Sequence, residues 1–61
     1  MPDELDSKTA ILDAAEQRFA RQGFDSTTIK EIASDAKVNT ALLYYYYGDK
    51  EKLYHAVLQK E

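Results

Sequence analysis

The side chains of this sequence that could do chemistry are hydroxyl and ammonium groups rather than a nucleophile paired with a base. His55 is the only histidine, the chain has no cysteine, and no serine or carboxylate is spaced to act as a partner for His55. We therefore expect no enzymatic activity, no metal site and no cofactor. Threonine, tyrosine and lysine side chains, which donate hydrogen bonds to phosphate oxygens, lie mainly after residue 26.

The net charge of −3 is unevenly distributed along the chain. Residues 1–26 contain six acidic and three basic side chains, which gives −3, whereas residues 27–61 contain five of each. A nucleic-acid-binding protein normally has a basic surface, so the total charge alone argues against one. The neutral second half is where contact with a polyanion is expected.

The length of 61 residues allows one small domain, whose fold buries only about 60% of the surface of its unfolded chain. A roomy catalytic cleft is not expected at this size. No segment approaches the roughly 20 apolar residues of a membrane span, and the N-terminus is acidic where a signal peptide would be basic. The expected location is the cytoplasm, without a membrane partner.

Apolar periodicity and turn residues predict the first two helices. Apolar side chains recur at the spacing of a helix over about residues 7–22, and Gly23 stands where a left-handed residue ends many helices. Thr28 and Glu31 then have the spacing of a capping box, which starts a second, short helix.

Two further helices follow from similar signals. Asn39 is a favourable N-cap for a third helix that runs from Thr40 to about Tyr46. Gly48 and Asp49 supply a stop and a new cap for a fourth helix, which the sequence predicts over residues 50–60. Leu53, Tyr54, Val57 and Leu58 form its apolar stripe.

These elements predict an all-α fold, in which three helices form a helix-turn-helix bundle of the homeodomain-like type and a fourth helix begins. The helix-turn-helix spans about residues 28–47, and its second helix presents side chains to a DNA major groove. The expected core consists of Ile11, Leu12, Ala15, Phe19, Phe24, Ile29, Ile32, Ala33, Val38, Leu43, Leu53 and Val57.

An ordered series of short motifs strengthens this interpretation. It comprises Ile11-Leu12-Asp13-Ala14-Ala15, Phe19, Gly23-Phe24, Thr27-Thr28-Ile29, Glu31-Ile32-Ala33 and the continuous segment 42–53. The series closely resembles the N-terminal DNA-binding domain of the TetR (tetracycline-repressor-like) family of bacterial transcriptional regulators, in register over about residues 7–58.

The resemblance implies a regulator, of repressor type, that binds a palindromic operator in double-stranded DNA as a homodimer. It also implies a separate C-terminal domain that forms the dimer interface and holds a small-molecule inducer. That domain is absent from these 61 residues, which divide into a flexible N-terminal arm, 1–6, and a TetR-type domain, 7–61.

Docking in the manner of the family places the N-terminal end of the third helix in the major groove. Asn39, Thr40 and Ala41 then lie nearest to base edges, although the side chain of Asn39 is expected to be used by the backbone N–H groups that it caps. The third helix has no arginine, so direct readout is sparse and specificity relies on DNA shape and water.

The remaining site residues follow from the resemblance as phosphate or groove contacts. Thr28 and Lys50 match phosphate-contacting positions of the family, and Thr27 does so more loosely. Among the tyrosines that replace the family's usual Tyr-Tyr-His-Phe, Tyr44 and Tyr45 match DNA-facing positions, Tyr46 stands at the histidine, and Tyr47 takes the place of a core phenylalanine.

Two positions depart from the family by carrying a side chain where glycine is usual. These are Ala41, in the third helix, and Lys37, in the turn before it. If residue 37 needs a positive φ, lysine costs about 1–2 kcal/mol relative to glycine, while its charge is added close to the DNA.

One alternative function remains open from the residues alone. A small helical module could bind another protein, either through its acidic first half or through Tyr54, Val57 and Leu58 in a helix-in-groove contact. The salt dependence of binding distinguishes DNA binding from protein binding. Binding to several phosphates weakens steeply as the salt concentration rises, whereas apolar docking does not.

Overall fold

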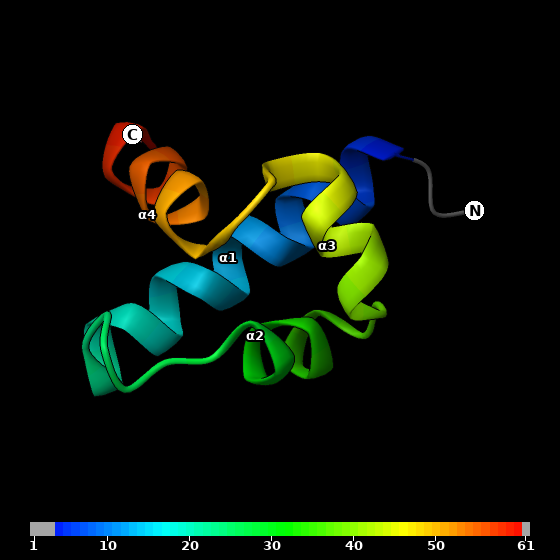
Figure 1. Ribbon diagram of the computed structural model, residues 1–61. Helices are drawn as coiled ribbons and strands as arrows, with labels where there is room; N and C mark the ends of the chain where they lie inside the picture. The colour runs from blue at the N-terminus through cyan, green and yellow to red at the C-terminus, as the bar shows by residue number, and fades with distance from the viewer. Residues whose placement is uncertain (1–3, 61) are drawn as a thin grey trace.

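A computed structural model describes residues 4–60 of the chain, with side chains from residue 6 onward. These residues form four helices and no strand, which confirms the all-α prediction. The helices are α1 (Glu4–Gln22), α2 (Ile29–Ala36), α3 (Thr40–Tyr47) and α4 (Lys50–Gln59), shown in Figure 1.

The first helix starts earlier than its apolar periodicity indicated. Residues 4–6, predicted as part of a flexible arm, are helical, and residues 1–3 of that arm lie outside the described residues. An acidic side chain such as Asp6 is favourable near the positive end of a helix, which offers a physical reason for the longer α1.

The second helix begins with the predicted capping box. The Glu31 N–H donates to Thr28 Oγ1 at 3.1 Å, and the Thr28 N–H donates to the Glu31 carboxylate at 3.1 Å. Two N–H groups at the helix start are thus satisfied by side chains rather than by water.

The caps of α3 and α4 are also as predicted. Asn39 Oδ1 accepts from the Leu42 N–H at 2.8 Å, and Asp49 Oδ1 accepts from the Lys52 N–H at 2.8 Å. Between the two helices, Gly48 has φ of 89°, a backbone conformation that other residues rarely adopt. The third helix ends at Tyr47, one residue later than expected.

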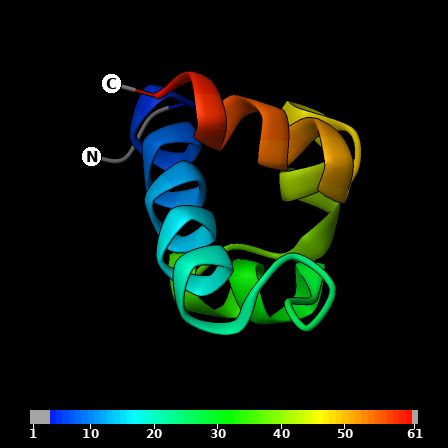
Figure 2. The same cartoon turned by 90° about the vertical axis from the view of Figure 1, so that its left-hand side faces the viewer.

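The core lies at the centre of the helices, which follow one another round a closed ring in Figure 2. All twelve predicted core residues are buried or pack against the buried cluster. The fully buried apolar side chains come from every helix: Ile11 and Ala15 from α1, Ile32 and Ala33 from α2, Leu43 from α3, Leu53 from α4, with Phe19 nearly as buried.

Tyr47 of α3 and Leu58 of α4 differ in how far they are buried. Tyr47 is half-buried and its hydroxyl donates to the Lys8 carbonyl at 3.1 Å, so it packs α3 onto α1 as predicted for a core position. Leu58, which belongs to the apolar stripe predicted for α4 but not to the predicted core, is 64% exposed.

Candidate nucleic-acid interface

The turn between α2 and α3 contains one residue in the left-handed conformation. Lys37 has φ of 63° and ψ of 39°, and its N–H donates to the Ser34 carbonyl at 3.1 Å. Val38 follows with an N–H donated to the Ala33 carbonyl at 3.0 Å and a side chain that packs on the core. These bonds end α2, and α3 begins three residues after Lys37, whose side chain is exposed in the turn.

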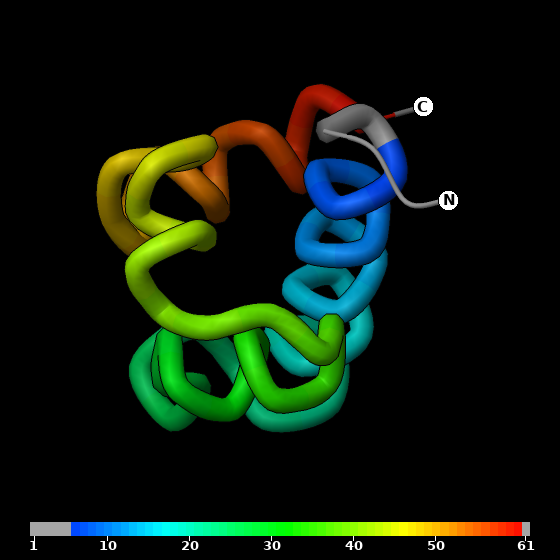
Figure 3. Tube along the Cα trace, turned by 90° about the vertical axis from the view of Figure 1, so that its right-hand side faces the viewer, coloured from blue at the N-terminus to red at the C-terminus, as the bar shows by residue number. Residues whose placement is uncertain are grey.

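Leu43 is buried at the centre of the face of α3 that packs on the core. The opposite face of the helix is its outer face. At about 100° per residue, Ala41 and Tyr45 lie opposite Leu43, and Tyr44 and Leu42 lie at either side. Tyr45 is 75% and Tyr44 47% exposed, and Ala41 is also exposed. Figure 3 shows α3 across the ring from α1, so α1 does not cover this face.

Asn39 serves as the cap of α3 in this structure. Its side-chain oxygen is bonded to the Leu42 N–H, which confirms the capping role, and its exposed amide N–H₂ remains outside that bond. Thr40 comes directly after it in the first turn of α3 and is exposed. The start of α3 therefore presents Asn39, Thr40 and Ala41 together at the surface.

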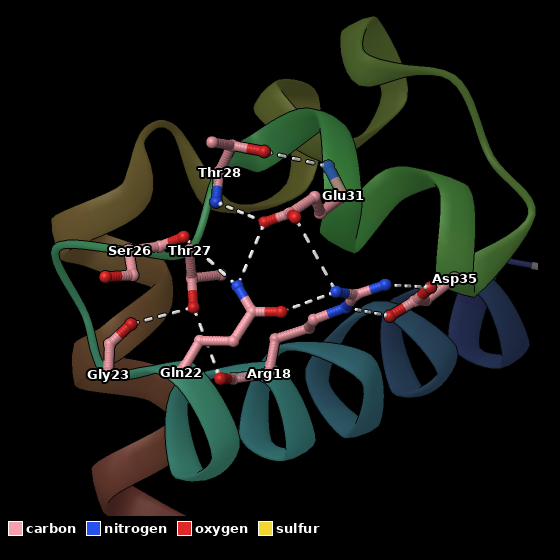
Figure 4. Close-up of polar contacts among 8 residues, drawn as sticks. All are labelled: Arg18, Gln22, Gly23, Ser26, Thr27, Thr28, Glu31 and Asp35. Carbon is pink, nitrogen blue, oxygen red and sulfur yellow. Dashed lines mark hydrogen bonds and ion pairs between the residues drawn. The ribbon is translucent and has the colours of Figure 1, made fainter.

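A polar network fixes both ends of α2 against α1, as Figure 4 shows. Arg18 of α1 forms a bidentate contact with Asp35, in which Nε donates to Oδ2 at 2.5 Å and Nη2 donates to Oδ1 at 3.0 Å. Arg18 also donates to Gln22 at 2.6 Å, and Gln22 in turn donates to Glu31 at 3.2 Å. The capping box of α2 is thus tied to the preceding helix.

This network shifts the pKa of both carboxylates in α2. The Thr28 N–H, with help from Gln22 and Arg18, lowers the pKa of Glu31. The hydrogen bond from Arg18 lowers the pKa of Asp35. Both groups are therefore held in the charged form in the folded state.

The prediction that Thr27 belongs to the interface was wrong. Its side chain is completely buried, and its hydroxyl donates to the Gly23 carbonyl at 2.8 Å, with the Arg18 carbonyl at 3.2 Å. A buried hydroxyl in this position closes the loop between α1 and α2 and does not reach a phosphate. The neighbouring Thr28 is exposed and keeps its place in the candidate interface.

Lys50 lies where α4 meets the start of α2. Its ammonium donates to the carbonyls of Phe24 at 2.8 Å and Thr27 at 2.9 Å and lies 4.3 Å from the centre of the Phe24 ring. These contacts bring the first residue of α4 beside the residues that precede α2. An ammonium has three N–H groups, so one remains for another acceptor beside Thr28.

The tyrosines of α3 point in different directions, as their spacing requires. Tyr45 and Tyr46 contact each other edge to face, with ring centres 5.4 Å apart, and Tyr46 is half-buried against the core. Tyr44 and Tyr45 are the two exposed tyrosines of the helix. The candidate interface therefore comprises Thr28, Lys37, Asn39, Thr40, Ala41, Tyr44, Tyr45, Tyr46 and Lys50.

The structure adds two residues that sequence reasoning missed. Lys30 is exposed in the first turn of α2, next to Thr28. Leu42 is only half-buried and is not one of the side chains that pack on the core. The helical spacing of Leu42 from Leu43, about 100° around α3, was the available signal that it points away from the core.

Other kinds of site find little support in the described part of the chain. His55 is exposed on α4, where it lines a surface hollow with Phe24 and Tyr54. Within residues 4–60 no three histidine, cysteine or carboxylate side chains come together as a metal site would require. None of the helices described is long and apolar enough to span a membrane.

Comparison with known proteins decides the family. Residues 11–57 match the family described as "Bacterial regulatory proteins, tetR family". The chain belongs to the TetR family. The match covers α2, α3 and the turn between them together with most of α1 and α4.

Relatives within the TetR family are regulators of transcription. The chain is 42% identical over 55 residues to the HTH-type transcriptional repressor SCO4008 of Streptomyces coelicolor, covering 90% of this chain and 29% of that protein. It is 45% identical over 49 residues to the HTH-type transcriptional regulator HbdR of Aromatoleum sp. (strain CIB), covering 80% of this chain and 21% of HbdR. The chain thus spans less than a third of the length of these relatives.

Solved structures agree with the sequence comparison. The crystal structure of HlyIIR, a hemolysin II transcriptional regulator, superposes with a TM-score of 0.91 at 41% identity, covering 95% of this chain and 32% of HlyIIR. The chain is therefore a TetR-type helix-turn-helix domain. These relatives give no support to the alternative of a protein-interaction module.

Proposed function

We propose that this domain is the DNA-binding domain, or DNA-reading head, of a TetR-family repressor and that α3 lies in the major groove. The observation that carries the proposal is the exposed outer face of α3, which follows a tight turn and begins with Asn39, Thr40 and Ala41. Helix-turn-helix proteins contact base edges with the N-terminal residues of this helix.

Phosphate contacts are proposed on both sides of α3. Thr28 and Lys30 lie at the start of α2, where the helix dipole and N–H groups favour an anion, and the Lys50 ammonium lies beside them. Lys37 supplies a further cation in the turn, and the exposed Tyr44 and Tyr45 supply hydroxyl donors along α3, with Tyr46 in contact with Tyr45. The cations concerned come from the half of the chain that carries no net charge.

The parent protein is proposed to bind a palindromic operator as a homodimer and to release it when a small molecule binds. Dimerisation and inducer binding belong to the C-terminal domain that the relatives' greater length implies. The proposed location is the cytoplasm, where bacterial DNA is found, and neither an enzymatic role nor a cofactor is proposed. Sedimentation of the full-length regulator with and without operator DNA tests the dimer.

Salt dependence tests DNA binding by the domain itself. A single head contacts one half-site, so we expect micromolar or weaker affinity for a mixed pool of labelled duplexes. Three lysines at the interface, each neutralising one phosphate, predict that affinity falls roughly 40-fold between 50 and 200 mM salt. Fluorescence anisotropy measures this slope, and an affinity that does not change with salt would contradict the proposal.

A further inference from the structure

The outer face of α3 carries no charged side chain. Its helix reads Thr-Ala-Leu-Leu followed by four tyrosines, and neither its first nor its last turn contains an acidic or basic residue. The side chains that best discriminate guanine, arginine and lysine, are therefore absent from the helix that enters the groove. Lys30, on α2, and Lys37, in the turn before α3, lie outside this helix.

Asn39 has the side-chain amide that could recognise adenine, but this amide already accepts a hydrogen bond as the cap of α3. Asparagine recognises adenine by accepting and donating at the same time. The side-chain oxygen of Asn39 already accepts from the Leu42 N–H at 2.8 Å. The bond to Leu42 occupies one of the two lone pairs of that oxygen and holds the amide in its capping orientation, which disfavours the paired contact with adenine.

The other side chains near the start of α3 present apolar groups. Ala41 lies opposite the buried Leu43, and Leu42 lies beside it, half-exposed and not packed on the core. Thr40 adds a methyl group in the same turn. The feature of a base pair that an apolar side chain contacts in the major groove is the C5 methyl group of thymine.

We infer that α3 recognises its half-site through thymine methyl groups, contacted by Thr40, Ala41 and Leu42, rather than through hydrogen-bonded guanine or adenine. This inference rests on the proposed function and specifies the chemistry that its site recognises. Each contacted methyl group loses its hydration on binding, and each such group contributes about fourfold to affinity.

Deoxyuridine provides the test, because it differs from thymidine only by that methyl group. The 61-residue chain is immobilised densely, a randomised duplex pool is selected on it, and the enriched half-site is resynthesised with single thymidines replaced by deoxyuridine. We expect at least one replacement to weaken binding about fourfold. Unchanged affinity at every thymidine, or an enriched half-site without thymine, overturns the inference.

Protein variants identify the residues that make the contact. In Leu42→Ala or Ala41→Gly, the penalty for deoxyuridine should disappear at one thymidine, because the partner of that methyl group is gone. Leu58→Ala, which removes the same groups from an exposed leucine of α4, should leave the penalty unchanged. A penalty that persists in both α3 variants overturns the assignment to these residues.

The outcomes separate this inference from the function on which it rests. Salt-dependent binding without an enriched sequence, or without a deoxyuridine penalty, leaves the DNA-reading head in place and overturns only methyl recognition. Absence of salt-dependent binding overturns both. Circular dichroism of each variant establishes that it retains the helical fold before its affinity is interpreted.

Discussion

Lys37 combines a structural cost with a proposed function. Its left-handed backbone, with φ of 63°, is one that a non-glycine residue adopts at a cost of about 1–2 kcal/mol. Its side chain is exposed in the turn before α3 and makes no contribution to the buried core. A lysine in this place is reasonable if its charge contributes to binding an anion.

Replacement of Lys37 by glycine should therefore change stability and DNA binding in opposite directions. We expect Lys37→Gly to stabilise the fold by about 1 kcal/mol, because glycine adopts the left-handed conformation without strain. The slope of log affinity against log salt should decrease in size by about 0.9, the value for one lost phosphate contact. Urea unfolding and salt titrations measure the two effects.

Lys30→Gln is the matched control for Lys37→Gly. It removes one exposed lysine from α2, where the backbone is helical, so the salt slope should fall without a gain in stability. If Lys37→Gly leaves the salt slope as it was, Lys37 does not contact phosphate.

Tyr45 is the most exposed aromatic residue of α3, and its ring contacts Tyr46. Tyr45→Phe removes only the hydroxyl, so we expect DNA binding to weaken about three- to tenfold with little change in stability. The same deletion in Tyr54→Phe, on α4, should affect neither property. Anisotropy titrations with each variant make the comparison, and wild-type affinity in Tyr45→Phe would contradict the DNA-facing assignment.

At the scale of single elements, local sequence signals were sufficient for three helices. Thr28, Asn39 and Asp49 each cap the helix that follows them, because a cap involves residues only three positions apart. The start of α1 was predicted too late, since residues 4–6 extend the helix beyond its apolar periodicity.

The attachment of α2 to α1 is the element-scale feature that pH should affect. Arg18 bonds Asp35 across the two helices, and the pKa values of Asp35 and Glu31 are lowered below their ordinary values of 3.8 and 4.5. A lowered pKa in the folded state stabilises the fold fully above those ordinary values. This stabilisation is lost as the pH falls through the folded-state pKa values.

Thermal unfolding at pH 7 and at steps below pH 4.5 measures this acid sensitivity. Wild-type protein should lose stability as the two carboxylates are protonated, and Asp35→Asn should reduce the stability at pH 7 and flatten the loss in acid. Asp25→Asn, which changes an exposed carboxylate of the α1–α2 loop, should follow the wild-type curve. If Asp35→Asn has the same acid dependence as wild type, the Arg18–Asp35 contact does not stabilise the fold.

At the scale of the whole molecule, the core was predictable and the long-range polar contacts were not. The predicted core residues of every helix are buried or packed on the core, so their identification required no tertiary information, and only Leu58 of the predicted apolar stripe on α4 is exposed. Thr27 and Lys50 were both predicted at phosphates. The Thr27 hydroxyl instead closes its own loop, and Lys50 also donates to the carbonyl of Thr27, 23 positions away in sequence. Such contacts depend on how α4 meets the α1–α2 loop, which local spacing does not specify.

The charge distribution of the folded domain resolves the apparent conflict between a net charge of −3 and DNA binding. Several acidic side chains are engaged within the protein, where Arg18 contacts Asp35 and Glu31, and Lys60 contacts Asp13 and Glu16. Lys30 and Lys37 lie exposed near α3, which itself has no acidic residue. Lysines close to α3 can contact phosphates on an acidic domain, since charges beyond about 10 Å are screened at 0.1 M salt.

The measurement that tests the central claim most directly is an NMR titration of this chain with a duplex pool at low and then moderate salt. It detects weak binding residue by residue, so it locates the interface as well as showing that binding occurs. We predict salt-sensitive shifts at the start of α2, in the turn at Lys37, along the outer face of α3 and at Lys50. Absence of shifts at these residues, or shifts confined to Tyr54, Val57 and Leu58 on α4, would contradict the assignment of this domain as a DNA-reading head.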